Sequence, residues 1–196
     1  MNQNNIERRV FSSPIEVRET GEGESRKIVG YAAVYSRQSE DLGFIETIEP
    51  GAFDGADTTD VRALINHDAD KILGRTSSGT LIVNIDENGL RYQLDAPDTT
   101  YANDLLVSMK RGDITQSSFA FAGVEDIWEE RDGKTYRTIK KIRTVYDVSP
   151  VTYPAYPDAS VALRSLEQFK EENKPTPQLA EDKDLDYRFA AIRALV

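Results

Sequence analysis

Short runs that alternate apolar and polar residues fill most of this chain, and they restrict it to a fold built mainly from β-strands. Between residues 10 and 166 the runs are separated by Gly, Pro, Asn and Asp, which favour turns. The strongest local signal is at residues 80–94, where two such runs flank Asp86-Glu87-Asn88-Gly89. Because Asn and Gly tolerate the positive φ of a tight turn, this segment predicts a β-hairpin. Further strands are expected at residues 10–17, 28–35, 44–48 and 61–66.

One segment has a helical period instead. Apolar residues recur every four positions between Thr99 or Thr100, an expected N-cap, and Gly112, an expected C-cap. This helix leads into a strand expected at residues 114–122. A second hairpin that turns at residues 131–133 and a last strand at residues 144–152 complete the pattern. The sequence therefore predicts a mostly β fold of the α+β class, with helix as the minority component.

The length of 196 residues is enough for one main domain, which we place at residues 1–166. Beyond residue 166 the composition becomes charged, and the run Lys174-Pro175-Thr176-Pro177 is typical of a solvated linker. Leu185, Phe189 and Ile192 then follow at helical spacing, so residues 167–196 are expected to be a linker that ends in a short helix. Two interpretations of that helix stay open: it packs on its own domain, or it docks on a partner or is removed.

The composition excludes several classes of protein. The chain has no Cys and one His, so disulfides, thiol nucleophiles and classical zinc sites are unsupported, and no metal or cofactor is expected. With 34 acidic and 24 basic residues the net charge is −10, which would repel nucleic acid. No stretch approaches the ~20 apolar residues of a membrane span, and the N-terminus lacks the pattern of a signal peptide. We therefore expect a soluble protein that acts where it is made, without nucleic acid or membrane as a partner.

The single histidine, His67, is the one side chain with an unperturbed proton affinity suited to acid–base catalysis near neutral pH. Alternation places it on the same strand face as Ala63 and Ile65, at the rim of the core, where the polar segment that begins at Asp68 follows. Two interpretations are open at this point. The imidazole is either a hydrogen-bonded structural group or a general base.

Two other polar residues lie within apolar runs. Ser118 shares a face with the small residue Ala120, which leaves room for a substrate carbonyl, although a Ser hydroxyl is inert without a base beside it. Asp147 lies in the last expected strand, where a buried carboxylate needs a donor such as an imidazole N–H. Oxyanion donors cannot be chosen from the sequence; Arg75 and the backbone N–H groups near Ser118 are the candidates.

Two familiar catalytic motifs, the phosphate-binding loop and the nucleophile elbow, are not present in this sequence. The run Gly133-Lys134-Thr135 ends like a phosphate-binding loop, but Trp128 replaces that loop's first Gly, so we expect a hairpin turn there. The pattern G-x-S-x-G of the nucleophile elbow is absent around Ser118. The sequence thus favours neither an ATPase nor an esterase of the elbow type.

Several separated motifs, in order, resemble those of the prohead maturation proteases of tailed bacteriophages. They are Ile65-Asn66-His67-Asp68, Ser118-Phe119-Ala120-Phe121 and Val148-Ser149-Pro150-Val151, and the similarity spans residues 10–166. The resemblance implies a serine endopeptidase with a herpesvirus-protease-like fold, an antiparallel β-barrel flanked by a few helices. It also implies that His67 is the base, Ser118 the nucleophile and Asp147 the third member of a triad. The sequence departs from the family at Ala120, usually Gly, and at Asp147, often Glu.

The resemblance further implies a role in virus assembly. Such a protease cleaves the major capsid protein and scaffold segments, and in this chain the C-terminal tail is a candidate for self-cleavage. The expected location is the assembling prohead in the host bacterial cytoplasm, and a homodimer is left open. The alternative is a catalytically inactive capsid-assembly or scaffold-associated protein that has the same barrel.

Overall fold

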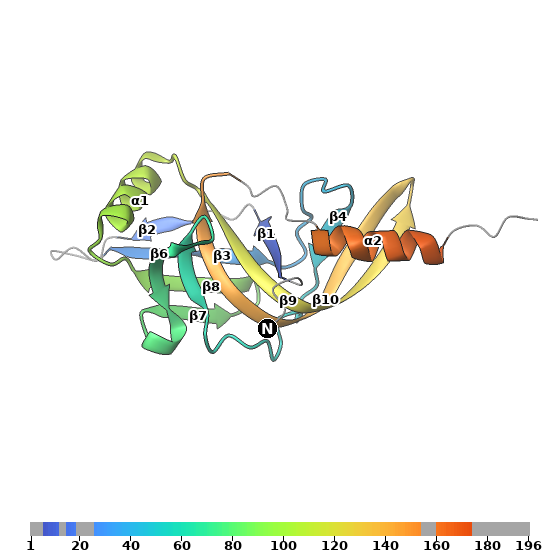
Figure 1. Ribbon diagram of the computed structural model, residues 1–196, viewed down its shortest axis with the longest axis horizontal. Coiled ribbons are helices and arrows are strands. Elements are labelled where there is room, and N and C mark those ends of the chain that lie inside the picture. The colour runs from blue at the N-terminus through green and yellow to red at the C-terminus, as the bar shows by residue number, and fades with distance from the viewer. Residues whose placement is uncertain (1–5, 12–14, 19–25, 154–159, 174–196) are drawn as a thin grey trace, which may run out of the picture.

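Two β-sheets and two α-helices form the part of the chain that the computed structural model describes, which is residues 6–11, 15–18, 26–153 and 160–173. Figure 1 shows α1 at one end of the molecule and α2 at the other, with the long β9 and β10 between them. The elements are β1 (Glu7–Phe11), β2 (Glu16–Arg18), β3 (Lys27–Val34), β4 (Ile45–Ile48), β5 (Arg62–Ile65), β6 (Asp68–Arg75), the 3-10 helix η2 (Thr76–Ser78), β7 (Leu81–Ile85), β8 (Gly89–Asp95), α1 (Thr100–Arg111), β9 (Gln116–Arg131), β10 (Lys134–Val151) and α2 (Ser160–Glu172).

The first sheet is built around the antiparallel pair β9 and β10. Its strand order is β1-β9-β10-β5-β6, and β4 also pairs with β10. The hairpin turn between β9 and β10 occurs where predicted, at Asp132 and Gly133, which have φ of 54° and 73°. The separate strands expected at residues 114–122 and 144–152 are the far ends of these two strands, because pairing continues from the turn to Val151 opposite Gln116. Two long strands therefore replace four short ones.

The second sheet has the order β2-β3-β8-β7. Its β7–β8 hairpin confirms the prediction at residues 80–94, and the backbones of Asp86 and Gly89 close the turn with hydrogen bonds of 3.0 and 3.3 Å. Gly89 has φ of 147°, and a Cβ at this position would lie 2.2 Å from the carbonyl oxygen of Ala33. Only glycine fits there, since β8 approaches the backbone of β3 so closely.

The expected closed barrel is not found among the described strands. Each sheet has two edges, β1 and β6 in one and β2 and β7 in the other, and no hydrogen-bonded ladder joins the sheets. Side chains join them instead: Phe119 and Phe121 of β9 share one buried core with Leu90 and Tyr92 of β8. The mostly β character with few helices is confirmed, and similarity to herpesvirus proteases stays a prediction.

Helix α1 confirms the helical period found in the sequence. Gly112 ends it in the left-handed conformation, with φ of 83° and a hydrogen bond from its N–H to the carbonyl of Met109. Thr99 has the extended backbone of an N-cap residue, but its side chain makes no capping hydrogen bond. Neither helix in the described part of the chain is long and apolar enough to cross a membrane.

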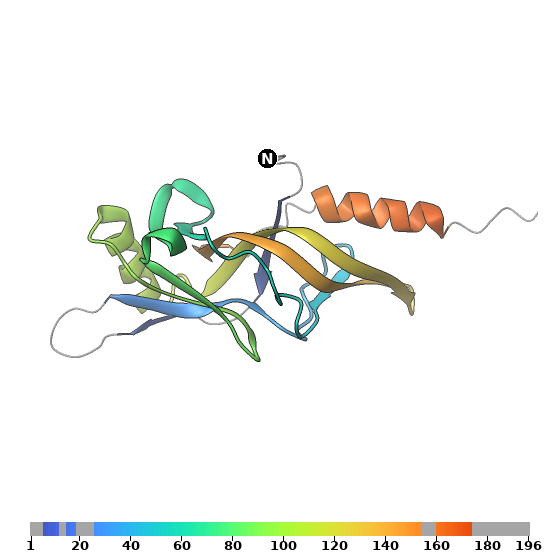
Figure 2. The same cartoon turned by 90° about the horizontal axis from the view of Figure 1, so that it is seen from below.

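Helix α2 lies beside the part of the β9–β10 hairpin that contains its turn, as both views show (Figures 1 and 2). Ala162 and Leu166 pack with Phe44 in a small second core, against which Trp128 and Phe169 also pack. The helix continues to Glu172, so the domain boundary placed at residue 166 falls inside it. That division stays a prediction, and the helix expected near the C-terminus lies outside the described residues.

Candidate active site

His67 lies in a tight turn and not at the end of a strand. Ile65 of β5 pairs with Asp68 of β6, and the two residues between them, Asn66 and His67, have φ of 52° and 58°. The prediction that His67 continues the strand was therefore wrong, and strand β6 was missed. Its first residues are largely exposed and charged, so they show no alternation of apolar and polar residues.

This turn is fastened to the end of β10 by Asn66. The backbone N–H of Asn66 donates to the carbonyl of Pro150 at 3.0 Å. The side-chain oxygen of Asn66 accepts from the N–H of Thr152 at 2.8 Å, and its amide nitrogen lies 3.2 Å from Thr152 Oγ1. These bonds hold the first of two successive left-handed residues, an arrangement that is costly for non-glycine residues and persists only where the surroundings impose it.

Ser118 lies on β9, between its partners Val10 of β1 and Ser149 of β10. The residue is fully buried, and its Oγ is 2.7 Å from Nε2 of His67. The same Oγ is 2.9 Å from the carbonyl oxygen of Arg9. Because a hydroxyl has one proton, it can donate to the imidazole or to this carbonyl, but not fully to both.

Asp147 reaches the other nitrogen of the same ring. Its Oδ1 is 2.6 Å from Nδ1 of His67. The register of β10 against β9 shifts between Val145 and Asp147, so Tyr146 is the extra residue of a bulge. Bulges re-aim side chains, and this one sets the direction of the carboxylate beside the imidazole. The carboxylate is therefore within hydrogen-bond distance of the ring.

The three residues singled out in the sequence thus form one hydrogen-bonded line. Ser118 is 51 residues from His67 and Asp147 is 80 residues from it. If Asp147 accepts the proton on Nδ1, then Nε2 has a free lone pair that can accept the Ser118 proton. A hydroxyl, an imidazole and a carboxylate in this order can generate an oxygen nucleophile and return its proton to a leaving group.

Arg75, one candidate oxyanion donor, has another partner. Its Nε and Nη2 lie 2.5 and 2.8 Å from the two carboxylate oxygens of Asp60. Asp60 raises the pKa of Arg75, and Arg75 in turn lowers the pKa of Asp60. Both groups are about half exposed, so this pair holds the end of β6 at the surface. Within the residues that the structure describes, no group of three acidic or imidazole side chains could bind a metal ion.

A buried ionic cluster fastens β1 to the first sheet. Arg137 Nη1 lies 2.6 Å from Glu7 Oε2 and 2.8 Å from Glu46 Oε2. Arg9 makes matching contacts, with Nη2 at 2.6 Å from Glu7 and Nε at 2.8 Å from Glu46. Asp126, which is 18% exposed, completes the cluster at 2.6 Å from Arg137 Nε, whereas the other four side chains are at most 2% exposed. The cluster holds the strand whose Arg9 carbonyl contacts Ser118.

Burial alone would raise the pKa of Glu7, but the hydrogen bond and charge of Arg137, with those of Arg9, hold it below its ordinary value of 4.5. A carboxyl whose pKa is lowered by folding stabilises the native state above its unfolded pKa, and this stabilisation is lost as the pH falls through the folded pKa. The protein is therefore expected to lose stability on acidification below about pH 4.5.

The Glu7→Gln variant should show a flatter decline in this acid range, because residue 7 then no longer titrates. Urea unfolding followed at a series of pH values between neutral and strongly acidic conditions measures the slope. Glu16→Gln is the matched control, since Glu16 is exposed and should leave the slope unchanged. Equal slopes for wild type and Glu7→Gln would contradict the prediction.

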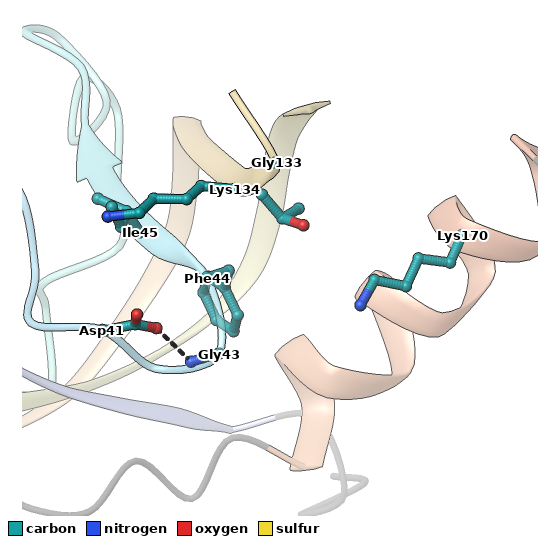
Figure 3. Close-up of a pocket in the computed structure, with 8 residues that line it drawn as sticks. Asp41, Gly43, Phe44, Ile45, Gly133, Lys134 and Lys170 are labelled. Carbon is teal, nitrogen blue, oxygen red and sulfur yellow. Dashed lines mark hydrogen bonds between the residues drawn. The ribbon is translucent and has the colours of Figure 1, made fainter. Parts of the chain in front are cut away.

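A cavity of about 260 Å³ lies away from these residues. Figure 3 shows Phe44 and Ile45 near β4, Lys134 at the start of β10 and Lys170 on α2 around it. Inside it, Asp41 accepts a hydrogen bond of 2.8 Å from the N–H of Gly43. None of its lining residues belongs to the hydrogen-bonded line, so it has no part in this site.

A hydroxyl, imidazole and carboxylate joined in this way are characteristic of serine hydrolases, and comparison with known proteins narrows the class. The family model described as caudovirus prohead serine protease matches residues 13–173, so this chain belongs to that family. The prohead protease of Enterobacteria phage HK97 is 31% identical over 153 residues, which cover 75% of this chain and 64% of the relative. The chain thus spans less than two thirds of the length of that relative. No solved structure matches this chain.

Sequence reasoning missed two residues that surround this line, Asn66 and Ser149. Ser149 follows Asp147 by two positions, and residues two apart in a strand share a face. That spacing was a usable signal. No signal in the sequence indicated the hydrogen bonds of Asn66 to Pro150 and Thr152, because they form only where the turn between β5 and β6 meets the end of β10.

Proposed function

We propose that this chain is a serine endopeptidase in which Ser118 is the nucleophile, His67 the general base and Asp147 the residue that orients it. The single observation that carries the proposal is the continuous line from Ser118 Oγ to His67 Nε2 at 2.7 Å and from His67 Nδ1 to Asp147 Oδ1 at 2.6 Å. Membership of the prohead serine protease family supports the same reaction. The alternative, an inactive assembly protein, does not account for why these three groups are aligned.

In the proposed mechanism, Nε2 of His67 takes the Ser118 proton as Oγ attacks the carbonyl carbon of a peptide bond. The tetrahedral intermediate then collapses: the C–N bond breaks, and the imidazolium gives its proton to the departing amine. A water molecule hydrolyses the resulting acyl-enzyme by the same proton path in reverse. The ionised carboxylate of Asp147 keeps the proton on Nδ1 and stabilises the imidazolium.

The proposed substrates are the major capsid protein and scaffold segments of the virus that encodes this chain, cleaved inside the assembling prohead in the host bacterial cytoplasm. This proposal depends on the family and on the prohead protease of phage HK97 as a relative. Cleavage of the chain's own tail and formation of a homodimer stay predictions.

Co-expression with the major capsid protein of the same virus tests this function. We expect new N-termini in the capsid protein with the wild-type chain and none with the Ser118→Ala variant. Intact mass spectrometry of both forms tests self-cleavage in the same samples. A capsid protein cut equally by both forms would contradict the proposed nucleophile, and identical full-length masses would contradict removal of the tail.

A further inference from the structure

Ser149 is a buried hydroxyl beside the proposed triad that the mechanism above does not use. It lies on β10 opposite Ser118 of β9, and two residues after Asp147, so its side chain shares a strand face with that carboxylate. The residue is fully buried. A buried hydroxyl is costly unless it is hydrogen-bonded, so its partners indicate what it does.

The partners of Ser149 are the two proton-handling members of the triad. Its Oγ is 3.0 Å from Oδ1 of Asp147 and 3.3 Å from the backbone nitrogen of His67. The donors are unambiguous, because an ionised carboxylate only accepts and a backbone N–H only donates. Ser149 therefore gives its proton to Asp147 and accepts the proton of the His67 backbone. The Oγ of Ser149 is 3.5 Å from Nδ1 of His67, which is much farther than the 2.6 Å between Nδ1 and Oδ1 of Asp147.

His67 needs such a support because of where it lies. With φ of 58° it is the second of two left-handed residues in the turn, and Asn66 fastens only the first of them. The Ser149 hydroxyl fastens the second through its backbone N–H. The same hydroxyl donates to the Asp147 carboxylate, which is in turn hydrogen-bonded to the His67 ring. Ser149 Oγ therefore contacts both residues of the His67–Asp147 hydrogen bond.

The geometry points to Ser149 as a positioning residue, which keeps the carboxylate of Asp147 and the imidazole of His67 in register for proton transfer. This inference rests on the proposed function, since it assigns Ser149 a task in that triad. Without the hydroxyl, the carboxylate loses a donor and the turn loses an acceptor. The ring then samples orientations in which Nε2 no longer faces Ser118, and small misplacements of this kind are costly for rate.

The test compares Ser149→Ala with wild type on a peptide that spans the cleavage site read from the co-expressed capsid protein. We expect kcat to fall about 10- to 100-fold with KM changed by less than about twofold, because orientation and not substrate binding is lost. The Ser149→Thr variant keeps the hydroxyl and should recover most of the lost kcat.

Ser117→Ala is the matched control, since it removes an equally buried hydroxyl from β9, the strand paired with Ser149. The Ser117 hydroxyl contacts Tyr92 Oη at 3.0 Å and the carbonyl of Ser149 at 3.3 Å, but no side chain of the triad. We expect its kcat to stay within about threefold of wild type, because ring orientation is untouched.

A second readout needs no turnover. The chain has one histidine, so the far-downfield proton signal of the imidazole N–H bonded to Asp147 has a single source in ¹H–¹⁵N NMR spectra. We expect this signal to move upfield or broaden in Ser149→Ala and to persist in Ser117→Ala and Ser149→Thr. An unchanged signal in Ser149→Ala would overturn the inference, whether or not kcat falls.

The two proposals fail separately. Full cleavage by Ser118→Ala would contradict the proposed function, whereas the imidazole signal of Ser149→Ala would still report on positioning. Loss of cleavage in Ser118→Ala, with wild-type kcat in Ser149→Ala, would overturn only the role of Ser149.

Discussion

The Ser118→Ala variant is expected to cleave its substrate at least about 1000-fold more slowly than wild type while keeping its fold. The Oγ of Ser118 is the atom that would form the bond to the substrate, and it is 2.7 Å from the proposed base. Removing it leaves His67 and Asp147 with no oxygen to activate. The lost hydrogen bond to the Arg9 carbonyl should cost about 1 kcal/mol of stability, which is too little to unfold the chain.

Initial rates on the capsid cleavage-site peptide measure the effect, and thermal unfolding verifies that the variant is folded. A serine-directed phosphonate adds a second measure, because it should add its mass to the tryptic peptide that contains residue 118 in the wild type and not in Ser118→Ala. Ser117→Ala is again the control, expected to cleave and to be labelled. Cleavage by Ser118→Ala at a wild-type rate would refute the assignment, and labelling found on Ser117 would name its replacement.

The Arg137→Ala variant is expected to lose about 3–5 kcal/mol of unfolding free energy. Burial alone would lower the pKa of Arg137, but the carboxylates of Glu7, Glu46 and Asp126 raise it, so the guanidinium stays charged. Its removal leaves Glu7 and Glu46, both at most 2% exposed, with only Arg9 as a buried counter-charge. Uncompensated buried charge is strongly destabilising.

Urea unfolding of Arg137→Ala at neutral pH measures this loss. Arg143→Ala is the matched control, since Arg143 lies on the same strand and pairs with Glu125 at 2.7 Å, but both side chains are more than half exposed. Exposed pairs contribute about 0–1 kcal/mol, so the control should unfold almost as wild type does. Equal losses in the two variants would show that burial of the cluster does not govern its energetics. Lowering the pH should narrow the difference in unfolding free energy between Arg137→Ala and wild type, because the carboxylates left with Arg9 as their counter-charge can then take up protons.

Local signals predicted the elements whose boundaries are set by a few neighbouring residues. The hairpin that turns at Asp86–Gly89 and the helix that ends at Gly112 were both found, because each contains a glycine whose positive φ few other residues adopt. Strand β6 was missed because its first half is exposed and charged. The prediction of a closed barrel was wrong because side-chain packing, and not a shared ladder of hydrogen bonds, joins the two sheets.

For the site, the sequence by itself determined which groups were available: one imidazole, no thiol, and a serine and an aspartate inside apolar runs. Only the tertiary structure decided that they meet. His67 reaches Ser118 because a two-residue turn reverses the chain there, and Asp147 reaches His67 because a bulge re-aims β10. Both depend on the pairing of strands far apart along the chain, and periodicity within one segment contains no information about such pairing.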